Sequence, residues 1–283
     1  MARRALAPAL LPVLTMLLAP APLSAWGDKG HRMACALALR SLPPGPRAWY
    51  SAREAELQDH ASDPDRWSAT DRKEKRRHYI HAEAYGGPGG VPPDQGEALA
   101  KVGPEAFQKA GQLPWIIQDR WQDLVDAFRG GDPRQVALAT AVLGHYVADL
   151  HVPLHTTQRH DGDGPGQRGL HQRWESSLVA RYVKEEELQV HPASEPAAGL
   201  RAPWAWMAAS HALVPKLLAD DLEAGQSSLG GKRGAAYRQV FWSLEGDTVK
   251  RQLEQSGQHL GDLVLMAWQA AGHPEAPSPN ASS

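Results

Sequence analysis

Thiols are almost absent from this chain of 283 residues. Cys35 is its only cysteine, so no disulfide can form within the chain, and stability must come from a packed core or from bound metal. Histidine is abundant by contrast, with 13 residues, all of them after residue 25. A chain poor in thiolates and rich in imidazoles favours metal sites built from nitrogen and oxygen ligands.

Long apolar runs are also missing, apart from one near the N-terminus. Residues 1–25 hold Arg3 and Arg4, an apolar stretch through Leu18, and small residues ending at Ala25, which are the three parts of a secretory signal. The stretch contains prolines and is shorter than the roughly 20 residues that a membrane-spanning helix needs, so cleavage is favoured over anchoring. We therefore predict a signal peptide over 1–25, a secreted or periplasmic protein, and no transmembrane anchor after cleavage.

Charge of one sign is not in large excess. The formal net charge is −2, and loss of Arg3 and Arg4 with the signal peptide changes it to −4. A mildly acidic protein is not a general polyanion binder, so any nucleic-acid chemistry needs a local site. The basic run RKEKRR, residues 72–77, could steer a phosphate-bearing substrate toward His78, although such runs are more often solvated helix faces. Nothing in the sequence implies a stable protein partner.

Alternation with a period of two, typical of β-strands, is absent, whereas helical periodicity recurs. Between Ile117 and Phe128, apolar residues follow one another at steps of three and four. Helices are expected at 30–41, 46–60, 97–110, 115–130, 134–150, 170–185, 203–222 and 235–270, the last broken near Gly257. With no internal repeat and no linker, these helices predict an all-α fold with one compact domain over 26–271, followed by a disordered tail over 272–283.

Two pairs of residues have the spacing of metal ligands on a helix. In LGHYVADLHVPLH, residues 143–155, His145 and Asp149 are four apart and so project from one helix face. His171 and Glu175 repeat the arrangement in GLHQRWES. A single pair of this kind is more often a capped or solvated pair, but the repetition favours a metal site with two centres, for which zinc is best suited.

The residue after the predicted cleavage site offers another ligand. If Trp26 is the mature N-terminus, its α-amino nitrogen and carbonyl oxygen can chelate a metal ion, and His31 can reach the same ion across the turn GDKG. The alternative is that Trp26 is simply the first core residue and that His31 is a hydrogen-bonded side chain at a helix start.

The motifs of this chain together resemble a known superfamily. They are WGDKGH (26–31), SDPD (62–65), HYIHAE (78–83), GHYVADLHVPLH (144–155) and GLHQRWE (169–175). In these segments and their order the chain is similar to the bacterial zinc-dependent phospholipases C and the zinc-dependent single-strand-specific nucleases of fungi and plants. The resemblance implies an all-α fold that holds three zinc ions. It implies that one ion is held by Asp65, His78 and His145, a second by Trp26 and His31, and a third by His155, His171 and Glu175, with Asp149 bridging the first two.

The resemblance also implies roles in catalysis. Three zinc ions would supply an activated water and the Lewis acids that phosphodiester cleavage needs. Asp65 and Asp149 are the candidate catalytic residues, and Asp65 is the candidate for orienting or deprotonating the attacking water. Tyr79 stands where the nucleases carry an aromatic residue that stacks on a base. His81 stands where they carry a base-recognising Asp.

The departures from the family patterns divide the substrate prediction. WGDKGH and HYIHAE resemble the nucleases, whereas the short, asparagine-free path from His155 to HQRWE, with Glu175 rather than an Asp as the last ligand, resembles the phospholipases. We expect a secreted zinc-dependent phosphodiesterase that cleaves single-stranded nucleic acid or nucleotides, with phospholipase C activity on phospholipid headgroups as the alternative. A third reading is a non-catalytic helical protein in which zinc replaces the missing disulfides; an open ligand position would distinguish an enzyme from it.

Overall fold

The computed structural model describes residues 26–226 and 234–277. The predicted signal peptide, 1–25, lies outside these residues, as does the 278–283 part of the predicted tail. Within the described ranges the chain forms helices and turns, and its only β-type pairing is the isolated bridge between Ile80 and Gly111. The all-α prediction is therefore confirmed.

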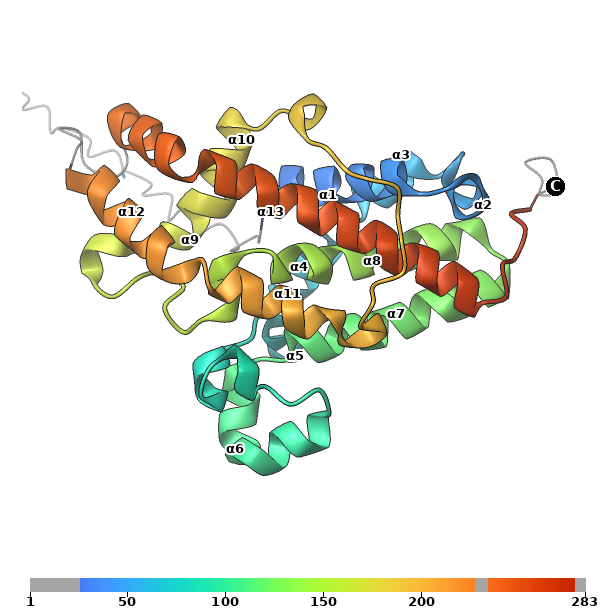
Figure 1. Cartoon of the computed structure of the whole chain (residues 1–283), viewed down its shortest axis with the longest axis horizontal. Helices are drawn as coiled ribbons and strands as arrows, with labels where there is room; N and C mark the ends of the chain where they lie inside the picture. The colour runs from blue at the N-terminus through green and yellow to red at the C-terminus, as the bar shows by residue number, and fades with distance from the viewer. Residues whose placement is uncertain (1–25, 227–233, 278–283) are drawn as a thin grey trace, which may run out of the picture.

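The helices pack along one long axis (Figure 1), and α13 runs the length of the molecule with α1 and α8 beside it. Helix α6 projects from one side of this assembly. The bounds are α1 (Gly27–Ser41), α2 (Pro44–Arg47), α3 (Glu54–Asp59), α4 (Asp63–Ser68), α5 (Arg72–Lys75), α6 (Gln95–Ala110), α7 (Leu113–Gly130), α8 (Pro133–Leu150), α9 (Leu170–Gln172), α10 (Val179–Tyr182), α11 (Ala202–His211), α12 (Val214–Gln226) and α13 (Ala235–Ala270).

The predicted break near Gly257 is wrong, because α13 is continuous through this position. Gly257 lies where α1 crosses, and a Cβ atom there would overlap the side chain of Leu37. One turn later, a Cβ on Gly261 would overlap Ser41. These glycines therefore permit close approach of two helices rather than a change of direction, a packing role that outweighs their lower helix propensity.

Other helices begin and end differently from the prediction. The range 46–60 divides into α2 and α3 with an intervening turn, and 203–222 divides into α11 and α12. Pro215 lies in the first turn of α12, where its missing N–H costs nothing, so it starts a new helix. The short helices α4 and α5 were not predicted; in α5 the Asp71 side chain caps the first turn by accepting a hydrogen bond from the Lys73 amide at 2.7 Å.

Two hydrophobic clusters, joined through α1, α8 and α13, form the core. One is built largely from α7, α8 and the C-terminal half of α13, and it buries Phe128 and Tyr146. The other surrounds Trp26, Trp174 and Phe241. Each fully buried side chain of this size contributes roughly 1.5–3 kcal/mol, so the protein has an extensive core despite lacking an internal disulfide.

The described part of the predicted tail, residues 272–277, lies against the helices. The Pro274 carbonyl accepts hydrogen bonds from the indole nitrogens of Trp49 at 3.1 Å and Trp268 at 2.9 Å. None of the described helices is long and apolar enough to cross a membrane.

Candidate metal centre

Helix α8 provides the centre of the site. Its first turn is capped by Asp132, and its last turns bury His145 and Asp149 completely. The Nδ1 atom of His145 lies 2.9 Å from the Ala61 carbonyl oxygen. Because a carbonyl can only accept, Nδ1 carries the proton and Nε2 presents its lone pair, which is the tautomer that a metal ligand needs.

Asp65 and His78 converge on this imidazole nitrogen from α4 and from the turn after α5. The Nε2 atom of His145 lies 3.6 Å from Asp65 Oδ1, 3.1 Å from His78 Nδ1 and 3.4 Å from Asp149 Oδ2. Two ligands bound at about 2.0–2.1 Å to a tetrahedral zinc ion lie about 3.3–3.4 Å apart. The spacing of this group, which we call the first cluster, fits a single ion.

Asp149 also faces a second group. Its Oδ1 atom lies 3.7 Å from His31 Nε2, whereas its Oδ2 atom lies 2.9 Å from His78 Nδ1. The ring of His31 stacks on that of His145, with centroids 4.0 Å apart. The two oxygens of one carboxylate thus point to different imidazoles, the arrangement expected of a carboxylate that bridges two ions.

Trp26 lies beside this second group. Its buried indole nitrogen donates a hydrogen bond to the Ala148 carbonyl at 2.6 Å, next to Asp149. A Cβ on Gly30 would come within 2.7 Å of the Trp26 Cβ, so the glycine allows this close approach. The GDKG segment predicted as a turn is the first turn of α1. The structure therefore brings Trp26 close to the bridging carboxylate, while coordination by its amine remains a prediction.

His155, His171 and Glu175 form a third cluster. The Glu175 Oε2 atom lies 2.9 Å from His171 Nε2 and 3.4 Å from His155 Nε2. Glu175 lies in a π-helical segment, Arg173–Leu178, between α9 and α10, and such wide turns occur frequently at functional sites. The Nδ1 atom of His155 donates to the His78 carbonyl, so a direct hydrogen bond links the third cluster to the first.

The donor atoms of these clusters fit a metal better than they fit one another. Oδ1 of Asp149, both carboxylate oxygens of Glu175, and Nε2 of His155 and His171 are buried and make no well-formed hydrogen bond. A buried polar atom left in this state costs about 1–3 kcal/mol. Bound cations would satisfy all of these atoms. His31, His145 and Asp149 form one possible ligand group, Asp65, His78 and His145 a second, and His155, His171 and Glu175 a third. Inside each group the ligand atoms lie within 4.8 Å of one another.

The protonation states support the same conclusion. Burial lowers the pKa of His145 well below its usual value, which leaves a neutral imidazole. Burial also lowers the pKa of His78, but hydrogen bonds with Asp149 and Glu74 outweigh it and raise that pKa to about 10. Burial would raise the pKa of Asp149, yet nearby imidazoles, His145 first among them, keep it below its usual range. An incoming metal ion would therefore displace a proton from His78.

Glu74 is a buried neighbour of the site that the motifs did not indicate. Its Oε1 atom lies 3.6 Å from His78 Nε2 and accepts a hydrogen bond from the Tyr146 hydroxyl. A carboxylate this close to the outer nitrogen of a ligand histidine favours one orientation of the ring through its charge. The four-residue spacing from Glu74 to His78 is the sequence signal that could have found it.

A cavity of about 250 Å³ opens onto the first and third clusters. Asp65, His78, His155 and His171 contribute to its wall. Tyr79 and His81 lie on the same wall, with their rings stacked at 4.6 Å. Asp149 and Glu175 do not line it, so Asp65 is the ligand-cluster carboxylate that reaches the cavity.

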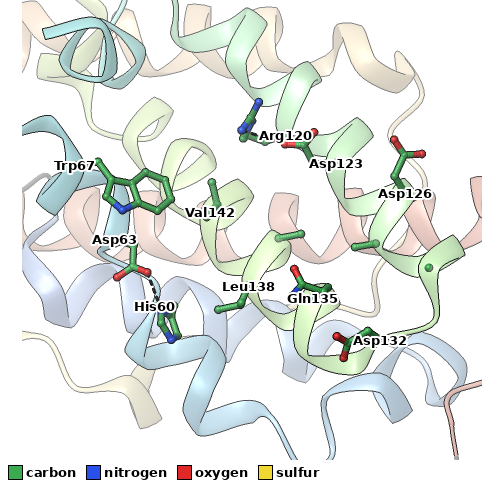
Figure 2. A pocket seen from close by; sticks show the side chains of 13 residues that line it. His60, Asp63, Trp67, Arg120, Asp123, Asp126, Asp132, Gln135, Leu138 and Val142 are labelled. Atoms are coloured by element: carbon green, nitrogen blue, oxygen red, sulfur yellow. Dashed lines mark hydrogen bonds and ion pairs between the residues drawn. The ribbon is translucent and has the colours of Figure 1, made fainter. Parts of the chain in front are cut away.

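A larger cavity, about 650 Å³, lies between α4, α7 and α8 but contains none of the clustered residues. Figure 2 shows Trp67 beside the apolar floor at Val142, with carboxylates around the rim. Three of the four carboxylates are ion-paired, Asp63 with His60 and Arg66, Asp123 with Arg120, and Asp126 with Arg129, and the fourth, Asp132, caps the first turn of α8. An acidic rim without metal ligands does not suit a phosphate ester, so the smaller cavity is the candidate active site.

Comparison with known proteins agrees with this geometry. A family model described as S1/P1 Nuclease matches residues 26–267, a range that contains all nine predicted ligand positions. A search of curated proteins finds no match.

Proposed function

Because this chain belongs to the S1/P1 nuclease family, we propose that it is a secreted, zinc-dependent phosphodiesterase that cleaves single-stranded nucleic acid or nucleotides. The observation that carries the proposal is the convergence of three groups of buried His and carboxylate donors, two of which border one cavity. The family match begins at Trp26, the residue predicted to follow signal cleavage, which supports the proposed export and the role of its amine.

The nine predicted ligand positions would hold three zinc ions. Zinc bound there would polarise the phosphate oxygens and lower the pKa of an attacking water. Asp149 is enclosed between imidazoles and away from the cavity, so we assign it to holding ions. Asp65 lines the cavity, and we assign it to orienting the attacking water and accepting its proton.

Tyr79 and His81 are the proposed base-binding surface. Stacking between a nucleobase and an aromatic ring contributes about 1–3 kcal/mol and tolerates any base. Burial lowers the pKa of His81, so its imidazole is neutral at pH 7 and can both donate and accept hydrogen bonds. A neutral imidazole in place of the family's Asp favours weak discrimination between bases.

Two other functions remain as alternatives. The first alternative is a phospholipase C that acts on phospholipid headgroups. It is supported by Glu175, because a Glu rather than an Asp as the last ligand of the third cluster is a feature in which the chain resembles the phospholipases. A purely structural zinc protein would need no opening to solvent beside its metal donors. The cavity beside the first and third clusters therefore supports an enzyme over that reading.

The test compares single-stranded DNA with phosphatidylcholine vesicles as substrates of the secreted, zinc-loaded protein, each with a chelated control. We expect chelator-sensitive cleavage of DNA. Release of a phosphorylated headgroup without DNA cleavage would establish the phospholipase alternative. Failure to cleave either substrate, together with unfolding on zinc removal, would establish the structural reading.

A further inference from the structure

The wall of the candidate active site contains one lysine or arginine among its described residues, Lys75. Lys75 is the last residue of α5 and precedes His78 by three positions, so both side chains lie toward the same cavity. The side chain of Lys75 is exposed, and no hydrogen bond or ion pair holds it within the described residues. This lysine is therefore available to bind a ligand.

The other cations of the basic run 72–77 are placed differently. Arg77 forms an ion pair with Glu74 at 2.7 Å, and Arg76 donates a hydrogen bond to Gln108. Arg72 and Lys73 are exposed and do not line the cavity. One residue of five is thus directed to the active site, while the others contribute to the surface or to structural contacts.

The chemistry of this position favours a phosphate. A lysine ammonium is a point charge on a flexible four-carbon chain and is well suited to phosphate oxygens. The ligand clusters lie buried at the inner end of the cavity, where the scissile phosphate must reach them, whereas Lys75 is solvent-exposed. A strand longer than the small cavity can enclose must continue past this exposed residue.

We propose that Lys75 binds the phosphate next to the scissile one, and that it makes the site prefer polynucleotides over compounds with a single phosphodiester. The proposal deepens the proposed function and rests on it. Lys75 is here a specificity-determining residue, because its partner is a phosphate that does not react.

The test uses the zinc-loaded protein, a short oligothymidylate, and the dithymidine that contains a single phosphodiester and no other phosphate. For Lys75→Gln we expect KM for the oligothymidylate to rise about tenfold with kcat little changed, since one charge-assisted contact to a phosphate that does not react is lost; tenfold corresponds to about 1.4 kcal/mol. The plot of log(kcat/KM) against log salt concentration should become less steep by about 0.7, the value for one phosphate contact on a single strand. The effect on the dithymidine should be much smaller.

Lys73→Gln is the matched control, because Lys73 lies on the same helix, is exposed and does not line the cavity. It should leave both substrates and the salt slope as in the unmodified protein, and Lys75→Arg should restore most of the affinity lost in Lys75→Gln. Equal losses on both substrates, or a salt slope unchanged from the control, would overturn the assignment of Lys75 alone. Absence of oligothymidylate cleavage by the unmodified protein would overturn the proposed function and this assignment with it.

Discussion

Two buried carboxylates, Glu175 and Glu245, lie near Trp174 and differ in their hydrogen bonding. Glu245 accepts a hydrogen bond from the Trp174 indole nitrogen at 2.9 Å and another from the Lys216 ammonium at 2.9 Å. Glu175, the next residue after Trp174, faces two imidazole nitrogens, and neither of its oxygens makes a well-formed hydrogen bond. Both carboxylates are buried, so burial alone does not distinguish a metal ligand from a structural residue.

The surrounding charges make the same distinction. Burial is the main cause that raises the pKa of Glu245, to about 7, and a hydrogen bond with Asp220 raises it further. Burial would also raise the pKa of Glu175, but the imidazoles of His171 and His155 outweigh it and lower that pKa. The feature that indicates a metal ligand is therefore a buried carboxylate that is kept ionised by imidazoles, which can themselves bind the metal.

The largest expected effect comes from Asp149, the residue proposed to join two metal positions. Asp149→Ala should remove zinc and reduce kcat/KM by at least about a thousandfold, since it affects two ions at once. The measurements are zinc content per chain and cleavage of single-stranded DNA. Full activity in this variant would contradict the proposed centre.

The comparison is tested directly by two matched substitutions of Glu by Gln. Glu175→Gln should lose the zinc of the third cluster and about a hundredfold of activity, because the amide is neutral and a poorer ligand. The Glu245→Gln protein should keep the zinc of the third cluster, because the Glu245 carboxylate is hydrogen-bonded to Trp174 and Lys216 and does not face that cluster. Equal zinc loss in both variants would show that the two carboxylates do not differ in function.

Metal removal should lower the unfolding temperature through the surroundings of Glu175 and not through those of Glu245. A chelator should lower the unfolding temperature of the unmodified protein by at least about 5 °C, since emptied clusters leave buried polar atoms unsatisfied. Glu245→Gln should show the same decrease and Glu175→Gln a smaller one. An unfolding temperature insensitive to chelation would mean that the clusters do not bind metal in the folded protein.

A further expected effect is on the pH dependence of stability. The folded pKa of Glu245, about 7, lies above its ordinary value of 4.5, so the folded state binds the proton more tightly. The corresponding stability is complete below pH 4.5 and is lost as the pH rises through 7, on the order of 2–3 kcal/mol. Urea unfolding from pH 5 to pH 8 should show this loss relative to Glu245→Gln. Parallel pH profiles for the two proteins would contradict it.

The sequence predicted much of the site because its ligands follow helical spacing. His145 with Asp149 and His171 with Glu175 are each four apart, and their clusters form where this spacing indicated. Sequence reasoning could not indicate the π-helical segment around Glu175, because backbone hydrogen bonding at that scale depends on packing. It also treated Gly257 as a helix break, since a glycine that admits a neighbouring helix looks the same in one dimension as one that ends a helix.

Lys75 shows a further limit of the sequence. The run 72–77 contains five cations with similar surroundings in the sequence. Only the three-dimensional path of α5 and the turn after it separates the one beside the cavity from those paired with Glu74 or Gln108. The same limit applies to Glu245, whose partners come from α12 and the π-helical segment.

The position of α13 has a consequence for how the protein is made. This helix is about 54 Å long, supplies residues to both hydrophobic clusters, and follows the other helices in the described part of the chain. Both clusters are complete only when α13 has packed on α1, where Gly257 and Gly261 lie against Leu37 and Ser41. Contacts between α1 and α13 join distant parts of the chain, so we expect the final packing of the core to come late in folding, after α13 has been made.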